Sequence, residues 1–221
     1  MSRVGLADLF TGILGVCALV SATLAVKQYS DNRLREEPIA APSFVAEWRA
    51  IEGLAGGEGR ATTGGRQAPV VVEFSDIQCP FCAIAHARLR ELQASAPASF
   101  RLMYRHRPLA SHPYAITGAV AAECTRAEGR FDAFLDVAFA HQSEIGRTEW
   151  TALARLAGVR DLAAFSTCLA REEPLARVLA DNEVAKRIGV VGTPGILIRD
   201  SLWLGALSLS DLHARIERAS R

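Results

Sequence analysis

The stretch VVVEFSDIQCPFC, residues 70–82, decides the fold of most of the chain. Its first part, Val70 to Ser75, is rich in β-branched residues and is typical of a buried strand. PFCAIAHARLRELQAS then predicts a helix over 80–95, and FRLMYRH predicts a second strand over 100–106. The helix is expected to place its apolar side chains near one face: Phe81, Ile84, Ala85, Leu89 and Leu92. A strand, a helix and a strand in this order favour a parallel pair.

The rest of the sequence completes an α/β pattern. About five helices are expected in an inserted block over about 114–189. GILIR and LWLGA predict two short strands in a hairpin split by Asp200 and Ser201, and the segment 208–220 predicts a final amphipathic helix. The order β-α-β, helical block, β-β-α is similar to the thioredoxin arrangement with helices inserted in its middle.

The N-terminal part differs in composition from this domain over 69–221. After a short tail, 1–8, residues 9–26 carry no charged side chain, and their length is close to the roughly 20 residues of a membrane-spanning helix. We predict an uncleaved transmembrane anchor, with a cleaved signal peptide as the alternative. Residues 27–68 are polar and then Gly-rich, which predicts a flexible linker with one possible short helix.

The overall charge excludes one class of partner. The 221 residues contain 25 basic and 24 acidic side chains, mixed along the chain without a long run of either sign. Proteins that bind nucleic acid through its phosphates need a basic surface. The composition therefore gives no reason to expect a nucleic acid partner.

Two cysteines at the start of the predicted helix are the first candidate for chemistry. Cys79 would lie at the helix N-terminus, where unpaired N–H groups and the helix dipole favour a thiolate. Cys82 would lie about one turn later, close enough to attack a mixed disulfide on Cys79. Pro80 is tolerated between them because the first turn needs no N–H donor there. We therefore expect Cys79 to be the nucleophile and Cys82 the resolving thiol of a redox-active disulfide.

A structural metal site is the competing interpretation of this pair. C-x-x-C can supply half of a zinc site, but the other half requires a second pair of Cys or His ligands at close spacing. Cys124 and Cys168 are far apart in the sequence, and His86, His106 and His112 are more simply packing or loop residues. We expect no metal and no cofactor besides the Cys79–Cys82 disulfide.

VVVEFSDIQCPFC and the distant GVVGTPGILI together resemble the DsbA-like thioredoxin-fold oxidoreductases, over about residues 69–220. The resemblance implies a cis peptide bond between Thr193 and Pro194, facing the two cysteines. An extended substrate peptide would pair with backbone groups beside this bond. The resemblance also implies that four residues contact the substrate: Pro80, Phe81, Thr193 and Pro194. Phe81 stands where the most oxidising members carry histidine, so we expect the Cys79–Cys82 disulfide to be a weaker oxidant than the disulfide of those members.

The same resemblance gives roles to three further residues. Family members carry an acid at the position of Glu73, beneath the active site, and this acid is thought to shuttle protons to the resolving cysteine. A partly exposed Glu at a strand edge is the alternative. Relatives also carry a second cysteine pair like Cys124 and Cys168, which implies a structural disulfide between helices of the inserted block. Two independent buried thiols remain the alternative.

These observations predict an extracytoplasmic thiol–disulfide oxidoreductase. It would be anchored in the membrane with its catalytic domain in the periplasm or at the cell surface, or secreted if the N-terminal segment is cleaved. The expected reaction is oxidation of cysteines in substrate proteins, with a membrane redox partner that restores the Cys79–Cys82 disulfide. A disulfide reductase or isomerase is one alternative. A non-catalytic, membrane-tethered peptide-binding module is another.

Overall fold

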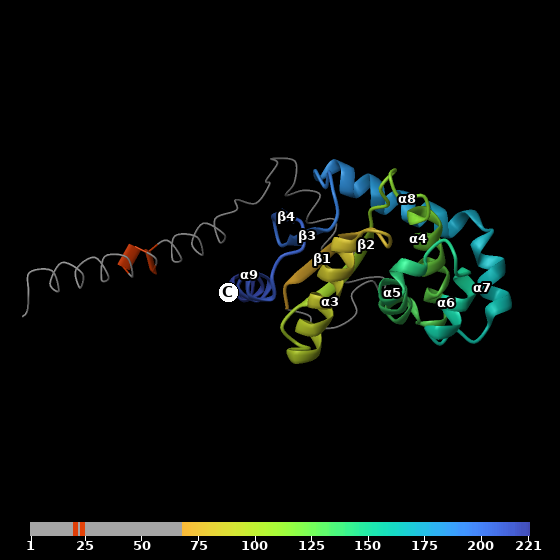
Figure 1. Cartoon of the computed structure of the whole chain (residues 1–221), viewed down its shortest axis with the longest axis horizontal. Coiled ribbons are helices and arrows are strands. Elements are labelled where there is room, and N and C mark those ends of the chain that lie inside the picture. The colour runs from red at the N-terminus through yellow and green to blue at the C-terminus, as the bar shows by residue number, and fades with distance from the viewer. Residues whose placement is uncertain (1–19, 22, 25–67) are drawn as a thin grey trace, which may run out of the picture. The chain divides into compact units, whose positions relative to one another are not determined.

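The computed structural model describes residues 20, 21, 23 and 24 and residues 68–221 (Figure 1). The predicted tail over 1–8 lies outside these residues, as do the anchor over 9–26 apart from those four positions and the linker over 27–68 apart from its last residue. Among the residues that are described, no helix has both the length and the apolar character needed to cross a membrane.

Residues 68–221 are built around a mixed sheet with the strand order β2-β1-β3-β4. The strands are β1 (Val70–Ser75), β2 (Arg101–His106), β3 (Gly195–Ile198) and β4 (Ser201–Leu204). β1 and β2 are parallel, as the β-α-β order predicted, whereas β3 is antiparallel to both β1 and β4. The thioredoxin-like α/β fold expected from the sequence is therefore confirmed.

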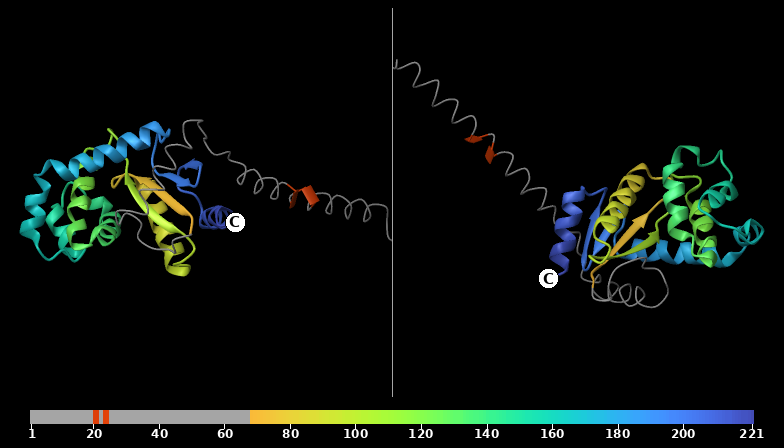
Figure 2. Two further views of the ribbon diagram at one scale, coloured as in Figure 1. Left: turned by 180° about the vertical axis from the view of Figure 1, so that it is seen from behind. Right: turned by 90° about the horizontal axis from the view of Figure 1, so that it is seen from below.

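Helices cover both faces of this sheet (Figure 2). α3 (Pro80–Ser95) and α9 (Leu209–Ala219) pack on the face that carries Val71, and α8 (Glu172–Arg187) packs on the face that carries Val70. Side chains of a strand alternate between the two faces, so Glu73 points to the same side as Val71, towards α3. This alternation places one carboxylate between the sheet and the helix that follows Cys79.

The helical block lies between β2 and β3 in the chain (Figure 1), and its apolar core also includes Tyr104 of β2 and the two cysteines Cys79 and Cys82. Before α8 it contains α4 (Ala115–Cys124), α5 (Phe131–Ala140), α6 (Trp150–Leu156), α7 (Leu162–Leu169) and two short 3-10 helices, Arg126–Glu128 and Gln142–Glu144. At Gly118 of α4, a Cβ atom would lie only 2.6 Å from Ile77 Cγ2. The absence of a side chain there allows α4 to approach the loop that carries the cysteines.

Two local predictions are wrong in detail. Phe81 and Ile84 are 61% and 43% exposed, because the buried face of α3 consists of Cys82, Ala85, His86, Leu89 and Gln93. Because two residues on that face, His86 and Gln93, are polar, the spacing of the apolar residues alone did not indicate which face is buried. The hairpin turn lies at Arg199 and Asp200, one residue earlier than expected, and Arg199 adopts a positive φ of 53°.

Candidate active site

Cys79 occupies the N-cap of α3, the position at which helical N–H groups lack partners within the helix. Pro80 takes the first helical position. The turn before the helix is fixed by a hydrogen bond from the Cys79 N–H to the Asp76 carbonyl, 3.0 Å long. Only 4% of Cys79 is exposed, whereas Pro80 and Phe81 face solvent. Cys79 thus lies buried beside two solvent-exposed residues.

Thr193 and Pro194 meet Cys79 although they follow it by more than a hundred residues. Their peptide bond is cis, and Cys79 Sγ lies 3.4 Å from the Thr193 carbonyl oxygen. The sheet explains this approach, because Phe74 at the end of β1 pairs with Gly195 at the start of β3. The loops that leave β1 and enter β3 consequently lie at the same edge, and each carries part of the site.

The two thiols differ strongly in acidity. A hydrogen bond from the Cys82 thiol lowers the pKa of Cys79 to about 5, against the effect of its burial. The Thr193 side chain and the N–H groups of Cys82 and Phe81 lower it further. Burial raises the pKa of Cys82 well above its usual range, and the nearby negative charge of Glu73 adds to this shift. Cys79 is therefore a thiolate at neutral pH and Cys82 a protonated thiol, the pattern of a nucleophile and a resolving cysteine.

The structure holds this pair in its reduced form, with both sulfurs unbonded to each other. Asp76 organises the loop around them. Its backbone N–H donates to Cys82 Sγ at 3.4 Å, and its carboxylate accepts hydrogen bonds from Gln78 N, Leu109 N and His112 Nδ1 at 2.7–2.9 Å. His112 is thus a partner of the active-site loop and not a simple loop residue.

Gln142, from the helical block, fixes the same loop from the other side. Its side-chain amide donates to the carbonyls of Ile77 and Cys79, both at 2.9 Å. Both acceptors lie in the turn that leads into α3. The block therefore helps to set the position of Cys79.

Glu73 is completely buried in the central strand, paired with Tyr104 of β2 on one side and Ile196 of β3 on the other. The alternative of an exposed edge position is therefore wrong. Its Oε2 atom lies 3.2 Å from Nδ1 of His86 on α3. Since the charge of Glu73 acts on both Cys82 and Tyr104, the carboxylate lies in one buried cluster with the resolving thiol.

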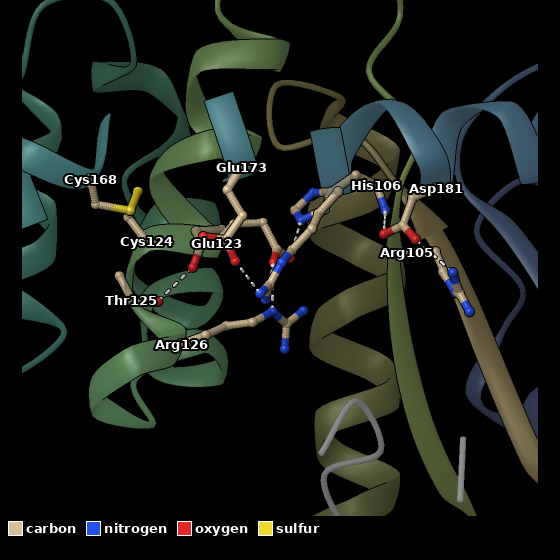
Figure 3. A network of polar contacts seen from close by, with 11 residues as sticks. Arg105, His106, Glu123, Cys124, Thr125, Arg126, Cys168, Glu173 and Asp181 are labelled. Carbon is tan, nitrogen blue, oxygen red and sulfur yellow. Dashed lines mark hydrogen bonds and ion pairs between the residues drawn. A yellow bond between two sulfur atoms is a disulfide. The ribbon is translucent and has the colours of Figure 1, made fainter. Parts of the chain in front are cut away.

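Cys124 and Cys168 form a disulfide between α4 and α7 (Figure 3). Next to it, Glu123 accepts hydrogen bonds from His106 Nε2 and Arg126 Nε, each at 2.9 Å. Burial opposes the charge of Glu123, but these two partners lower its pKa to about 2. His106 lies in β2 and not in a loop, so this ion pair connects the sheet to the helical block.

Sequence reasoning missed His86, Asp76 and Gln142. His86 follows Cys82 by four residues, the spacing that places two side chains on one helical face, and this signal was available. The partners of Asp76 and Gln142 come from segments distant in sequence, so no local pattern could identify them. No group of three or more potential metal ligands occurs within the described part of the chain.

Curated proteins with detectable similarity are much longer than the matched region. A protein named Na(+)/H(+) antiporter NhaA 3 from Salinispora tropica is 34% identical over 158 residues, which is 71% of this chain and 24% of that protein. The NhaA 1 antiporter of Mycolicibacterium vanbaalenii is 29% identical over 164 residues, 72% of this chain and 26% of that protein. The chain spans about a quarter of the length of these relatives, so their name does not transfer to it.

Three solved structures with a similar fold are distant from this chain in sequence. The thiol-disulfide exchange protein alpha-DsbA2 from Wolbachia pipientis superposes with a TM-score of 0.68 at 16% identity, covering 80% of this chain and 95% of that one. The catalytic domain of Proteus mirabilis ScsC gives 0.66 at 17% identity, covering 79% and 97%. A thioredoxin-like oxidoreductase from Silicibacter pomeroyi gives 0.62 at 24% identity, covering 81% and 98%.

These neighbours have the fold of thiol–disulfide oxidoreductases, and the residues that surround Cys79 in this chain fit that fold. A family model described as thioredoxin matches residues 57–218, which is most of the chain and includes both cysteine pairs and the cis-proline. The chain belongs to the thioredoxin family.

Proposed function

We propose that this protein is a thiol–disulfide oxidoreductase that exchanges a Cys79–Cys82 disulfide with cysteines of substrate proteins, and that it acts as a dithiol oxidase. The observation that carries the proposal is the opposite acidity of the two thiols, lowered for Cys79 and raised for Cys82. A stabilised Cys79 thiolate stabilises the reduced form, which makes the disulfide form an oxidant.

The reaction begins when a substrate thiolate attacks Cys79 Sγ of the disulfide. The bond to Cys82 breaks, and Cys82 Sγ leaves with the electron pair and takes up a proton. The second thiolate of the substrate then attacks the substrate sulfur that is bonded to Cys79, and Cys79 leaves as a thiolate. The substrate loses two electrons and two protons, of which one proton stays on Cys82 and the other passes to solvent.

Substrate recognition is assigned to the surface around Cys79. Thr193 and Pro194 present backbone groups beside the sulfur, and an extended peptide can pair with such groups as an added strand. Phe81 and Val191 are 61% and 77% exposed and supply apolar contact on either side. Pro80 completes this surface. Glu73 has a separate role in the proposal: it exchanges the proton that Cys82 gains or loses.

We also propose an extracytoplasmic location, with a membrane anchor over residues 9–26 and a membrane redox partner that accepts the two electrons. The Cys124–Cys168 disulfide supports an oxidising compartment, because structural disulfides persist there. The four described residues of the predicted anchor are helical.

Replacement of the resolving thiol tests the exchange chemistry. Cys82→Ser leaves Cys79 able to attack a substrate disulfide but removes the group that releases the product. We expect mixed disulfides on Cys79 that are visible in non-reducing gels and disappear on reduction, and none in Cys79→Ser. If Cys82→Ser traps no species, a non-catalytic binding module becomes the better interpretation.

The redox state in cells then tests the direction. A dithiol oxidase is kept mostly as the Cys79–Cys82 disulfide, whereas a reductase or isomerase is kept mostly as the dithiol. Acid quenching followed by alkylation and mass measurement reports the ratio. A predominantly reduced pair would contradict the oxidase direction.

A further inference from the structure

His86 is a buried, titratable side chain that the exchange reaction as described above does not use. It follows Cys82 by one helical turn on the buried face of α3, and only 5% of it is exposed. Its two ring nitrogens contact two different carboxylates. Nδ1 lies 3.2 Å from Glu73 Oε2, and Nε2 lies 2.8 Å from Asp136 Oδ1 on α5.

Asp136 connects His86 to solvent. Its side chain is 41% exposed, whereas that of Glu73 is fully buried. Arg90 holds both oxygens of the Asp136 carboxylate through Nε and Nη2, each at 3.1 Å. A continuous series of titratable groups thus runs from the buried acid beside Cys82 to solvent.

The remaining groups around His86 leave it charged. Glu73 approaches from β1, Tyr104 from β2, Asp132 and Asp136 from α5, and Cys82 and Arg90 share its helix. The Phe139 ring covers it with 4.8 Å between ring centroids. Burial opposes the charge, but the two carboxylates that it contacts raise the pKa of His86 to about 9. His86 is therefore a buried cation that lies beside the buried Glu73 carboxylate.

Loss of the Cys82 proton changes the net charge of the buried pair Glu73 and His86. Cys82 and Glu73 are both 0% exposed, so water does not receive the thiol proton directly. The second oxygen of Glu73, Oε1, is buried and has no hydrogen-bond partner among the described residues, so it can accept a proton. Protonated Glu73 next to a His86 cation would leave one uncompensated charge in the interior, which is costly.

We propose that His86 and Asp136 compensate this charge: when Glu73 Oε1 takes the proton of Cys82, His86 releases its Nε2 proton through Asp136 to solvent. The Nδ1 proton of His86 stays on the hydrogen bond to Glu73 Oε2, and both members of the pair become neutral. In the opposite direction, Asp136 returns a proton to His86 as Glu73 gives its own to Cys82. His86 and Asp136 are positioning residues, and this role rests on the proposed thiol–disulfide exchange.

The step to be measured is the closure of the disulfide. Full-length protein with glutathione attached to Cys79 is mixed from low pH into buffers from about pH 6 to about pH 8. Cys82 loses its proton, its sulfur bonds to Cys79 Sγ, and glutathione leaves with the electron pair. The rate of glutathione release is compared for wild type, His86→Gln, Asp136→Asn and the control His213→Gln, whose side chain is 59% exposed on α9.

Wild type is expected to release glutathione at a rate that barely changes over this range, because the proton acceptor is internal. His86→Gln keeps a hydrogen-bonding side chain but cannot ionise, so we expect release about 10-fold or more slower and rising with hydroxide concentration. Asp136→Asn is expected to show a smaller slowing in the same sense, and His213→Gln none. Alkylation of Cys79 by iodoacetamide should stay within about twofold in all variants, since the nucleophile does not depend on this path.

Equal rates and equal pH dependence in wild type, His86→Gln and Asp136→Asn would overturn the proton path while leaving the exchange function intact. If wild type itself accepts no glutathione on Cys79, the proposed function fails first and the path with it. If His86→Gln does not fold, Asp136→Asn decides alone, because its side chain is partly exposed and its replacement is nearly isosteric.

Discussion

The dipeptide between the two cysteines lowers the pKa of Cys79 only through the backbone N–H of Phe81. Pro80 starts the helix, and Phe81 offers its backbone N–H but no charged side chain. The pKa of about 5 therefore comes from the Cys82 thiol, Thr193 and the helix N-terminus. Because this value lies between about 3.5 and about 7, the extremes of related oxidoreductases, we expect a reduction potential between about −120 and about −270 mV.

Phe81→His tests this view at a single residue. An imidazolium beside Cys79 should stabilise its thiolate and lower its pKa by about one unit, which corresponds to about 30 mV in reduction potential. In wild type the thiolate fraction rises with pH through about 5, so alkylation of Cys79 should be half-maximal there. The midpoint should shift to lower pH in Phe81→His, measured by iodoacetamide rates. An unchanged midpoint would show that this position does not control the thiolate. Ile84→His is a suitable control, since it is also exposed on α3.

At the scale of elements, the sequence predicted the strands well and the helix faces less well. The predicted bounds of β1 are confirmed, because a β-branched run that follows a proline and ends before Asp76 has few other interpretations. The sequence indicated the wrong face of α3 because its buried side carries two polar residues, His86 and Gln93. His86 is hydrogen-bonded to Glu73 on β1, whereas Gln93 accepts a hydrogen bond from Arg90 on α3 itself. The contact between Cys79 and Thr193 depends on the register of β1 with β3, which no local pattern encodes.

The disulfide between α4 and α7 permits a prediction at this scale. It closes a loop with a sequence separation of 44 residues, which contributes about 4 kcal/mol in the chain-entropy model. Cys124→Ser with Cys168→Ser should lower the free energy of unfolding by up to this amount, measured by urea denaturation. Because the bond involves neither Cys79 nor Cys82, the alkylation rate of Cys79 should not change. A double variant with wild-type stability would show that the bond does not staple the helices.

At the scale of the whole molecule, the fold brings together the ends of distant segments at one edge of the sheet. Cys79 follows β1, Pro194 precedes β3, and Gln142 reaches the same loop from the helical block. Composition and motif order predicted the thioredoxin-like domain over 69–221. A β-α-β unit with C-x-x-C and a distant Thr-Pro is, in combination, specific for this fold. The anchor over 9–26 stays a prediction, as it depends on residues outside those described.

The transfer of two hydrogens from a substrate tests the central claim most directly. Oxidised full-length protein is mixed in equal amount with a peptide that contains two cysteines, and both masses are followed after acid quenching. We predict that the peptide loses two hydrogens while the protein gains two on Cys79 and Cys82, much faster than with oxidised glutathione alone. Cys79→Ser should be inactive, and Cys124 and Cys168 should stay joined. If both masses stay unchanged, or if the hydrogens appear on Cys124 and Cys168, the assignment of Cys79–Cys82 as the reactive couple is wrong.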